Sequence, residues 1–141
     1  MLLDPSGLPL TALDSFNVEL STPTAFDGAT TDARGNDGGT SDPLTLYTVT
    51  GDVLVRIFGV CTTVLAGATA TLEVGVANNI AVLIAQTTAT DIDAEEIWLG
   101  AAPSEISVDA LSDVTGPFII VNGANIIETV ATADVTSGQI Y

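Results

Sequence analysis

The feature that most constrains the fold is a strict alternation of apolar and polar residues in TATLEVGV, residues 69–76. The apolar positions are Ala70, Leu72, Val74 and Val76, and the intervening ones are Thr69, Thr71, Glu73 and Gly75. Successive side chains of a β-strand point to opposite faces, so a period of two predicts a strand. We expect one face of this strand to be buried and the other to contact water.

Three pairs of strand-like segments flank turn residues, and each pair predicts an antiparallel hairpin. The pairs are 44–50 with 52–60 around Gly51, 69–76 with 80–86 around Asn78-Asn79, and 117–121 with 124–131 around Asn122-Gly123. Asn and Gly tolerate the positive φ of a type I′ turn. Residues 89–99 fit either a turn of helix or an irregular connection with a short strand, and residues 134–141 fit the start of a further strand. Short strands separated by turns predict an all-β fold, an antiparallel β-sandwich or jelly roll.

The first 43 residues differ from the rest of the chain. Residues 1–20 carry scattered Leu, Phe and Pro and predict an extended N-terminal arm, whose first residues lack the positive charge of a secretory signal. Residues 21–43 consist mostly of Thr, Ser, Gly, Asp and Pro and predict a long polar loop. The sequence therefore predicts an arm and loop over 1–43 and a β-sandwich body over 44–141.

Charge and missing residue types exclude several classes of function. The chain has 18 Asp and Glu, 2 Lys and Arg and no His, for a net charge of −16. Nucleic-acid and anionic-membrane binding grow with Lys and Arg contacts, so both are excluded as primary functions. Without His there is no His-based triad, and a single cysteine, Cys61, forms no internal disulfide. We expect a protein that is not an enzyme, with Cys61 packed as a small hydrophobe and Arg56 paired with Glu73.

An acidic cluster is the one candidate metal site. Asp91, Asp93, Glu95 and Glu96 lie within six residues, and calcium binds six to eight oxygen ligands from flexible loops. The spacing is not that of an EF-hand, so a solvated acidic loop is the alternative to a structural Ca²⁺ site. A pair of glycosidase carboxylates beside Trp98 is a further alternative, which the small number of aromatic residues disfavours.

Three segments together resemble a known group of proteins. They are YTVTGDVLVRIFGVCTT (47–63), ATLEVGVANNIAVLIAQTTATDIDAEEIW (70–98) and NGANIIETVATADVTSGQI (122–140). In composition and order they resemble proteins encoded among the virion structural genes of tailed bacteriophages. The resemblance implies a virion component, and head decoration (cement) proteins fit best in size and β character. It implies a homotrimer, made in the host cytoplasm, that docks on the major capsid protein at the capsid surface.

The predicted arm supplies apolar contacts for such docking. The candidate partner-binding residues are Leu8, Leu10, Leu13 and Phe16. Apolar contacts are not weakened by salt, and an extended segment can add to a neighbour's sheet edge.

Two other classes of function stay open on the sequence alone. A tail or fibre module could bind host-surface carbohydrate through Tyr47, Trp98 or Tyr141. A soluble protein of a high-salt organism would also be rich in acids and poor in Lys.

Overall fold

The computed structural model describes residues 19–100, 103–105 and 119–141. Its strands are β1 (Leu44–Tyr47), β2 (Asp52–Val55), β3 (Gly59–Ala66), β4 (Thr71–Val76), β5 (Asn79–Thr88), β6 (Glu96–Trp98), β7 (Ser104–Glu105), β8 (Ile119–Asn122), β9 (Ile126–Ala131) and β10 (Ser137–Ile140). One turn of 3₁₀ helix, η2 (Ala89–Asp91), follows β5. Within the described ranges, no helix is long and apolar enough to cross a membrane.

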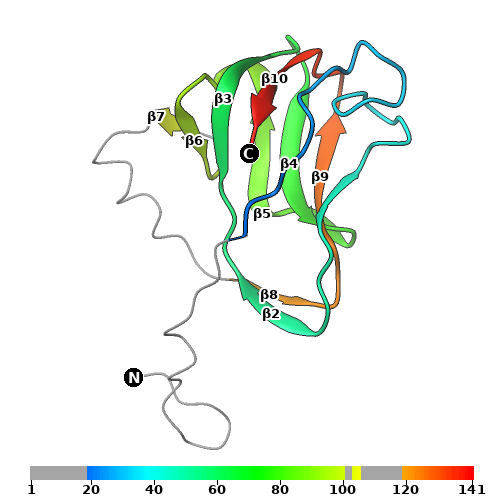
Figure 1. The fold of residues 1–141 in the computed structure, drawn as a ribbon, viewed down its shortest axis with the longest axis vertical. Helices are drawn as coiled ribbons and strands as arrows, with labels where there is room; N and C mark the ends of the chain where they lie inside the picture. Colours follow the sequence, from blue (N-terminus) through cyan, green and yellow to red (C-terminus); the bar gives the residue numbers. More distant parts are fainter. Residues whose placement is uncertain (1–18, 101–102, 106–118) are drawn as a thin grey trace, which may run out of the picture.

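The strands form two four-stranded sheets and a two-stranded ribbon, shown in Figure 1. The first sheet has the order β1-β9-β4-β5, the second has the order β10-β3-β6-β7, and β2 pairs with β8. Every pairing is antiparallel. The two sheets pack around one core, whose fully buried side chains include Leu72, Val74 and Ile84 from the first sheet and Cys61 and Trp98 from the second. The predicted all-β antiparallel fold is confirmed.

The hairpin between β4 and β5 is confirmed, with a different turn. Val76 pairs with Asn79, so Ala77 and Asn78 are the turn residues. Positive φ among the described non-glycine residues occurs at Asp32, Glu95 and Thr132. The turn is therefore not the type I′ turn that the two asparagines suggested.

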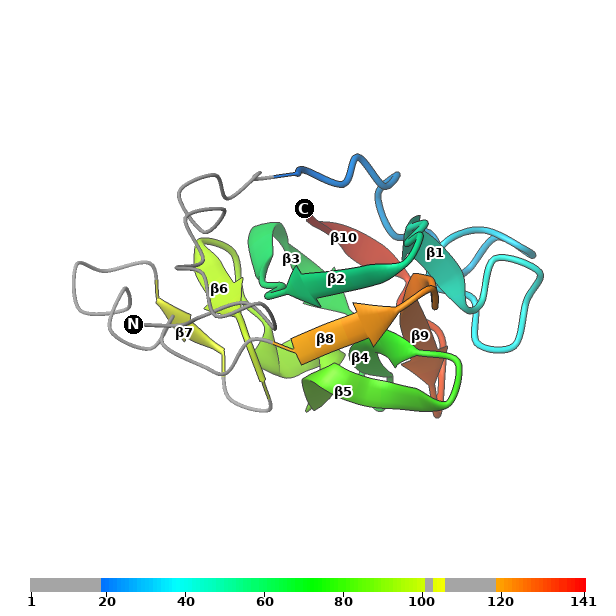
Figure 2. The same ribbon diagram turned by 90° about the horizontal axis from the view of Figure 1, so that it is seen from below.

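The other two predicted hairpins are wrong, because their strands pair with distant partners. β1 pairs with β9 and β2 pairs with β8, with Asp52 opposite Asn122. Gly51 and Gly123 both have positive φ, at 71° and 59°, and the N–H of Gly123 donates to the carbonyl of Gly51 at 2.8 Å. Positive φ here produces a bend in two paired segments, so that they leave the first sheet together and continue as the β2–β8 ribbon (Figure 2).

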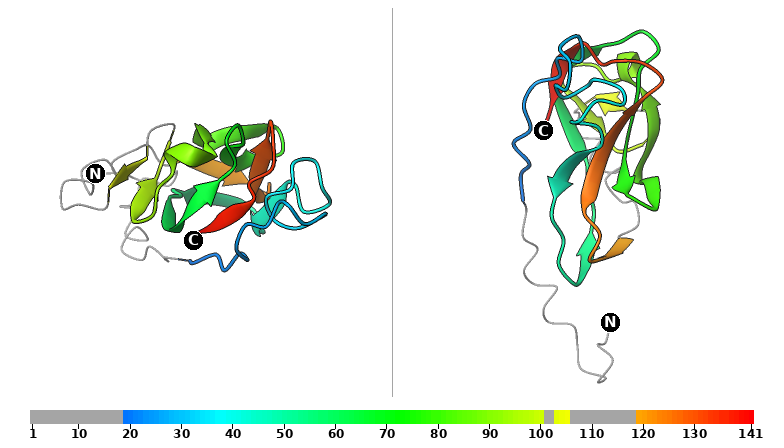
Figure 3. Two further views of the ribbon diagram at one scale, coloured as in Figure 1. Left: turned by 90° about the horizontal axis from the view of Figure 1, so that it is seen from above. Right: turned by 90° about the vertical axis from the view of Figure 1, so that its right-hand side faces the viewer.

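The polar loop of residues 21–43 belongs to the body, which corrects the predicted boundary at residue 43. Phe26 is buried, and its N–H donates to the carbonyl of Gly138 at 2.9 Å. The N–H of Gly28 donates to Val135, and the N–H of Val135 donates to Gly35. These long-range contacts fasten the loop beside the C-terminal segment, at the end of the body opposite the β2–β8 ribbon (Figure 3).

The alternation in β4 is only half reflected in burial. Leu72 and Val74 are buried as predicted, but Glu73 is also buried and is 5% exposed. Burial and, secondly, the charge of Asp42 in the polar loop raise the pKa of Glu73, and the Asp42 carboxylate accepts the N–H of Val130 at 2.9 Å. The predicted wet face is therefore largely covered.

Three further local predictions are confirmed, whereas the strand predicted over 52–60 is divided, because β2 ends at Val55 and β3 begins at Gly59. Residues 89–99 form η2, an irregular connection and the short strand β6, which is the second of the two alternatives. Residues 137–140 form β10, which pairs with β3. Cys61 is buried in the core.

Candidate functional site

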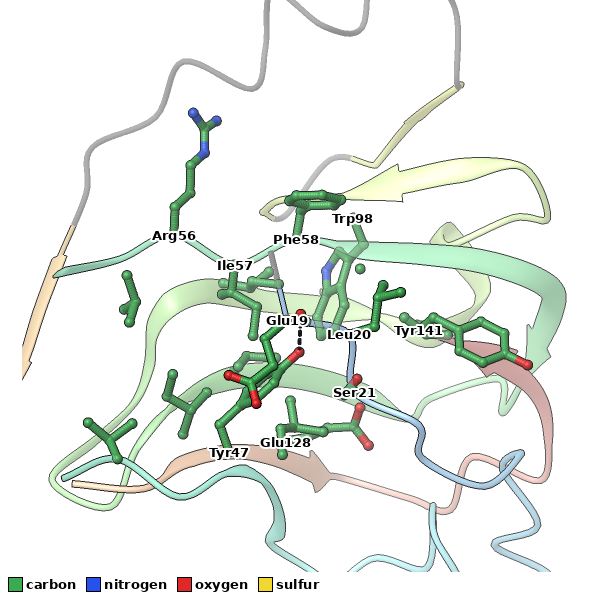
Figure 4. Close-up of a pocket in the computed structure, with 18 of the residues that line it drawn as sticks. Glu19, Leu20, Ser21, Tyr47, Arg56, Ile57, Phe58, Trp98, Glu128 and Tyr141 are labelled. Carbon is green, nitrogen blue, oxygen red and sulfur yellow. Dashed lines mark hydrogen bonds between the residues drawn. The ribbon is translucent and has the colours of Figure 1, made fainter. Parts of the chain in front are cut away.

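An apolar groove opens between the inner face of the first sheet and residues 46–60 (Figure 4). Its volume is about 720 Å³. Val74, Ile84 and Ile126 line it from the sheet, and Trp98 and Ile140 line it from the opposite sheet. The lining contains far more aliphatic and aromatic than polar side chains. We call this cavity and its lining residues the groove.

Exposed apolar side chains gather at the groove. Seven large hydrophobic residues are exposed in the described ranges, and five of them line the groove: Leu20, Val53, Leu54, Phe58 and Tyr141. The other two, Val64 and Ile80, lie elsewhere. Large contiguous apolar patches on a protein surface mark interaction sites, whereas isolated exposed hydrophobes are ordinary. The groove is thus the strongest candidate for a binding surface.

The groove also contains both cationic side chains of the chain. Arg34 and Arg56 line it together with the carboxylates of Glu19 and Glu128. Two positive and two negative charges cancel, so the net charge of −16 resides on the rest of the chain. A negatively charged protein can therefore approach the groove against less repulsion than it would meet elsewhere.

Arg34 and Glu128 form a buried ion pair at the groove. Nε and Nη2 of Arg34 donate to the two carboxylate oxygens of Glu128 at 2.9 and 2.5 Å. Nη1 donates to the carbonyls of Thr24 and Ile140, and the guanidinium lies 3.9 Å from the ring centre of Phe26. Arg34 therefore joins the polar loop, β9 and the end of β10 at one point.

The predicted ion pair between Arg56 and Glu73 does not form. Figure 4 shows the Arg56 side chain directed away from the other labelled groove residues. In the described part of the chain, the one ion pair within 4.0 Å is that of Arg34 with Glu128. The partners of that pair are 94 residues apart, so no local sequence signal could have identified it.

The N-terminal segment enters the described structure at the mouth of the groove. The hydroxyl of Tyr47 donates to the carbonyl of Glu19 at 3.1 Å, and residues 19–21 line the groove. The predicted partner-binding residues Leu8, Leu10, Leu13 and Phe16 lie outside the described residues. They precede Glu19 by 3 to 11 residues in the sequence.

The acidic cluster is not arranged as a metal site. Asp91 lies in η2, and the carboxylate of Glu96 accepts the N–H of Asp93 at 2.8 Å. Among the residues that the structure describes, no three acidic or cysteine side chains are placed to hold a metal ion. Trp98 is 1% exposed and donates its indole N–H to Thr87 at 2.8 Å, so it presents no face on which a sugar could stack.

Comparisons with protein-family models, with curated proteins and with solved structures found no match.

Proposed function

We propose that this chain is a non-enzymatic structural component of a bacteriophage virion, a head decoration protein that docks on the major capsid protein and assembles as a homotrimer. The observation that carries the proposal is the concentration of exposed apolar side chains around a groove without net charge. Such a surface is typical of protein–protein contacts. The resemblance of the sequence to virion proteins of tailed phages is the reason for proposing a phage capsid as the partner.

Electrostatics restricts how such a protein can associate. Three copies would carry 3 × (−16) = −48 charges, so any contact between acidic surfaces is opposed by long-range repulsion. At 1 M salt the Debye length is about 3 Å, which removes most of this repulsion and leaves apolar contacts intact. We therefore expect attachment to the capsid to persist or strengthen at high ionic strength.

The test is a particle-binding assay with purified protein and undecorated capsids, followed by electron microscopy. Full-length protein should stay bound in 1 M salt. Leu54→Ser should reduce binding, because Leu54 is exposed at the groove, and Val64→Ser is the matched control with nearly equal exposure elsewhere, 47% against 49%. Release of the full-length protein by 1 M salt, or equal binding of both variants, would contradict docking through apolar contacts at the groove.

A second candidate function is a tail or fibre module that binds host-surface carbohydrate. The rings of Phe58 and Tyr141 are both exposed at the groove and could stack on a sugar. A glycan array with the purified protein distinguishes the two functions. Sugar binding that is lost in both Phe58→Ala and Tyr141→Ala would favour the carbohydrate module.

A further inference from the structure

We propose that the groove receives residues 1–18 of a second copy of this chain, so that the oligomer is held together by exchanged N-terminal segments. The proposal rests on the proposed function in one respect, since it explains how the oligomer forms. It assigns a specific occupant to the groove, so that the assembled oligomer contacts the capsid and Leu54→Ser reduces capsid binding through loss of the oligomer.

The groove has the dimensions of a site that another molecule fills. Protein interiors are close-packed and contain few voids larger than a water molecule. Pockets that bury a ligand have volumes of about 300–1,000 Å³, and the groove lies within that range at about 720 Å³. An aliphatic surface of this size gains free energy when apolar side chains replace water on it.

Residues 1–18 have the chemistry that the groove would bind. Their large apolar side chains include Leu8, Leu10, Leu13 and Phe16, and their only charged side chains are the two acids Asp4 and Asp14. Arg34 is already paired with Glu128, and the Arg56 side chain is directed away from the other labelled groove residues, so the match between segment and groove rests on apolar side chains. Fully extended, 18 residues span about 60 Å, which is enough to reach an adjacent copy.

The entry geometry favours exchange between copies over return into the same groove. Residues 19–21 already lie at the mouth, where Tyr47 holds the carbonyl of Glu19. Because residues 19–21 already form part of the lining of their own groove, the remaining apolar surface is open to a segment from a second copy.

Exposed apolar side chains also lie on both faces of the β2–β8 ribbon. Val53 and Leu54 are successive residues of β2, so their side chains point to opposite faces of the ribbon, and both are exposed. A second copy can contact both faces. Exchange in which each chain donates its segment to the next is a head-to-tail interface, which closes into a ring when the rotation allows, as in a trimer.

Crosslinking between differently labelled chains tests the occupant. We would prepare Ser15→Cys in an affinity-tagged chain and Thr50→Cys, at the groove, in an untagged chain. The two would be unfolded, refolded together and treated with a flexible bismaleimide. Cys61 can stay, because it is buried and burial raises the pKa of its thiol. Thr69→Cys is the matched control, an exposed threonine that does not line the groove.

We expect Ser15→Cys and Thr50→Cys to give a crosslinked pair of one tagged and one untagged chain. This product should be at least fivefold more abundant than the corresponding product of Ser15→Cys and Thr69→Cys. Sedimentation should show oligomers for the native chain and for Val64→Ser, and monomers for Leu54→Ser and for a chain lacking residues 1–18. Circular dichroism would verify that each variant folds.

Three results would overturn the proposal. These are crosslinking only within single chains of a Ser15→Cys/Thr50→Cys double variant, equal crosslinking to Thr69→Cys, or oligomers that persist without residues 1–18. Capsid binding is measured separately. If the oligomer depends on exchange but the protein does not bind capsids, the proposed function fails and the exchange stands. If the protein binds capsids but shows no exchange, the exchange fails and the proposed function stands.

Discussion

Replacement of Arg34 by Met should strongly destabilise the body. Arg34 and Glu128 are each 3% exposed, and the substitution leaves the Glu128 carboxylate buried without its cation. It also removes the donors to the carbonyls of Thr24 and Ile140. Breaking a buried pair by removing one partner costs about 3–5 kcal/mol, because the remaining charge has lost both water and its counterion.

Two further variants distinguish the cost of the unpaired Glu128 charge from the cost of lost packing around Arg34. The double variant Arg34→Met/Glu128→Leu removes both charges, and apolar replacements of buried pairs are often neutral, so at least about 2 kcal/mol should be recovered. Arg56→Met makes the same chemical change at the other arginine, which has no ion pair in the described part of the structure. We expect that control to change stability by no more than about 0.5 kcal/mol.

The assay is equilibrium unfolding in urea, followed by fluorescence of the single tryptophan. Trp98 is fully buried in the core and should report its loss. A loss of about 4 kcal/mol would correspond to a fall in Tm on the order of 10 °C for a chain of this size. If Arg34→Met costs no more than Arg56→Met, or if the double variant is as unstable as the single one, the ion pair does not hold the loop, β9 and β10 together.

Three further predictions follow from other contacts. Burial and, secondly, the charge of Asp42 raise the pKa of the Glu73 carboxyl above 4.5. The native state therefore keeps this proton to higher pH than the unfolded chain, and stability falls as pH rises through 4.5 and the native pKa. Glu73→Gln should accordingly raise Tm at neutral pH, with no gain in acid, and a lowered Tm at neutral pH would refute this. Gly123→Ala should cost about 1 kcal/mol in urea unfolding because of its positive φ, and Gly100→Ala, which meets no neighbour and has no positive φ, should cost less. Chelation with EDTA should leave Tm unchanged, and a fall would show that residues 91–96 bind a cation after all.

Local sequence patterns predicted most strands but could not predict which strands pair. The dipeptide Asn122-Gly123 indicates a residue with positive φ, and Gly123 has one. The same conformation serves a hairpin turn or a bend in a continuing strand, and the choice depends on the partner across the sheet. That partner is the segment around Gly51, more than 70 residues away, which carries a glycine of the same kind. Gly51 and Gly123 could have predicted the shared bend only if the pairing of β2 with β8 had already been known.

Composition misled the interpretation of residues 21–43 for a related reason. Many Gly, Ser, Thr and Asp residues indicate turns, and the segment does consist of turns. Composition does not indicate whether such turns pack on the body. One aromatic residue and one arginine can anchor them, and two residues hardly change the composition of the segment. Phe26 stacks on Arg34, and Arg34 pairs with Glu128, so these two side chains, together with the backbone hydrogen bonds to Val135 and Gly138, anchor the predicted polar loop on the body. The groove was equally invisible, since its lining comes from segments spread from residue 19 to residue 141.

The two arginines occupy different environments, and this difference bears on the proposed association. Arg34 is buried and forms an ion pair with the buried carboxylate of Glu128. Its further hydrogen bond to the carbonyl of Ile140 holds the polar loop against the end of β10. The other arginine stays at the groove, where exposed apolar side chains gather. The acidity of the chain is therefore compatible with the proposed assembly through the groove, because the charges that line the groove cancel, whereas repulsion disfavours contacts between strongly acidic surfaces.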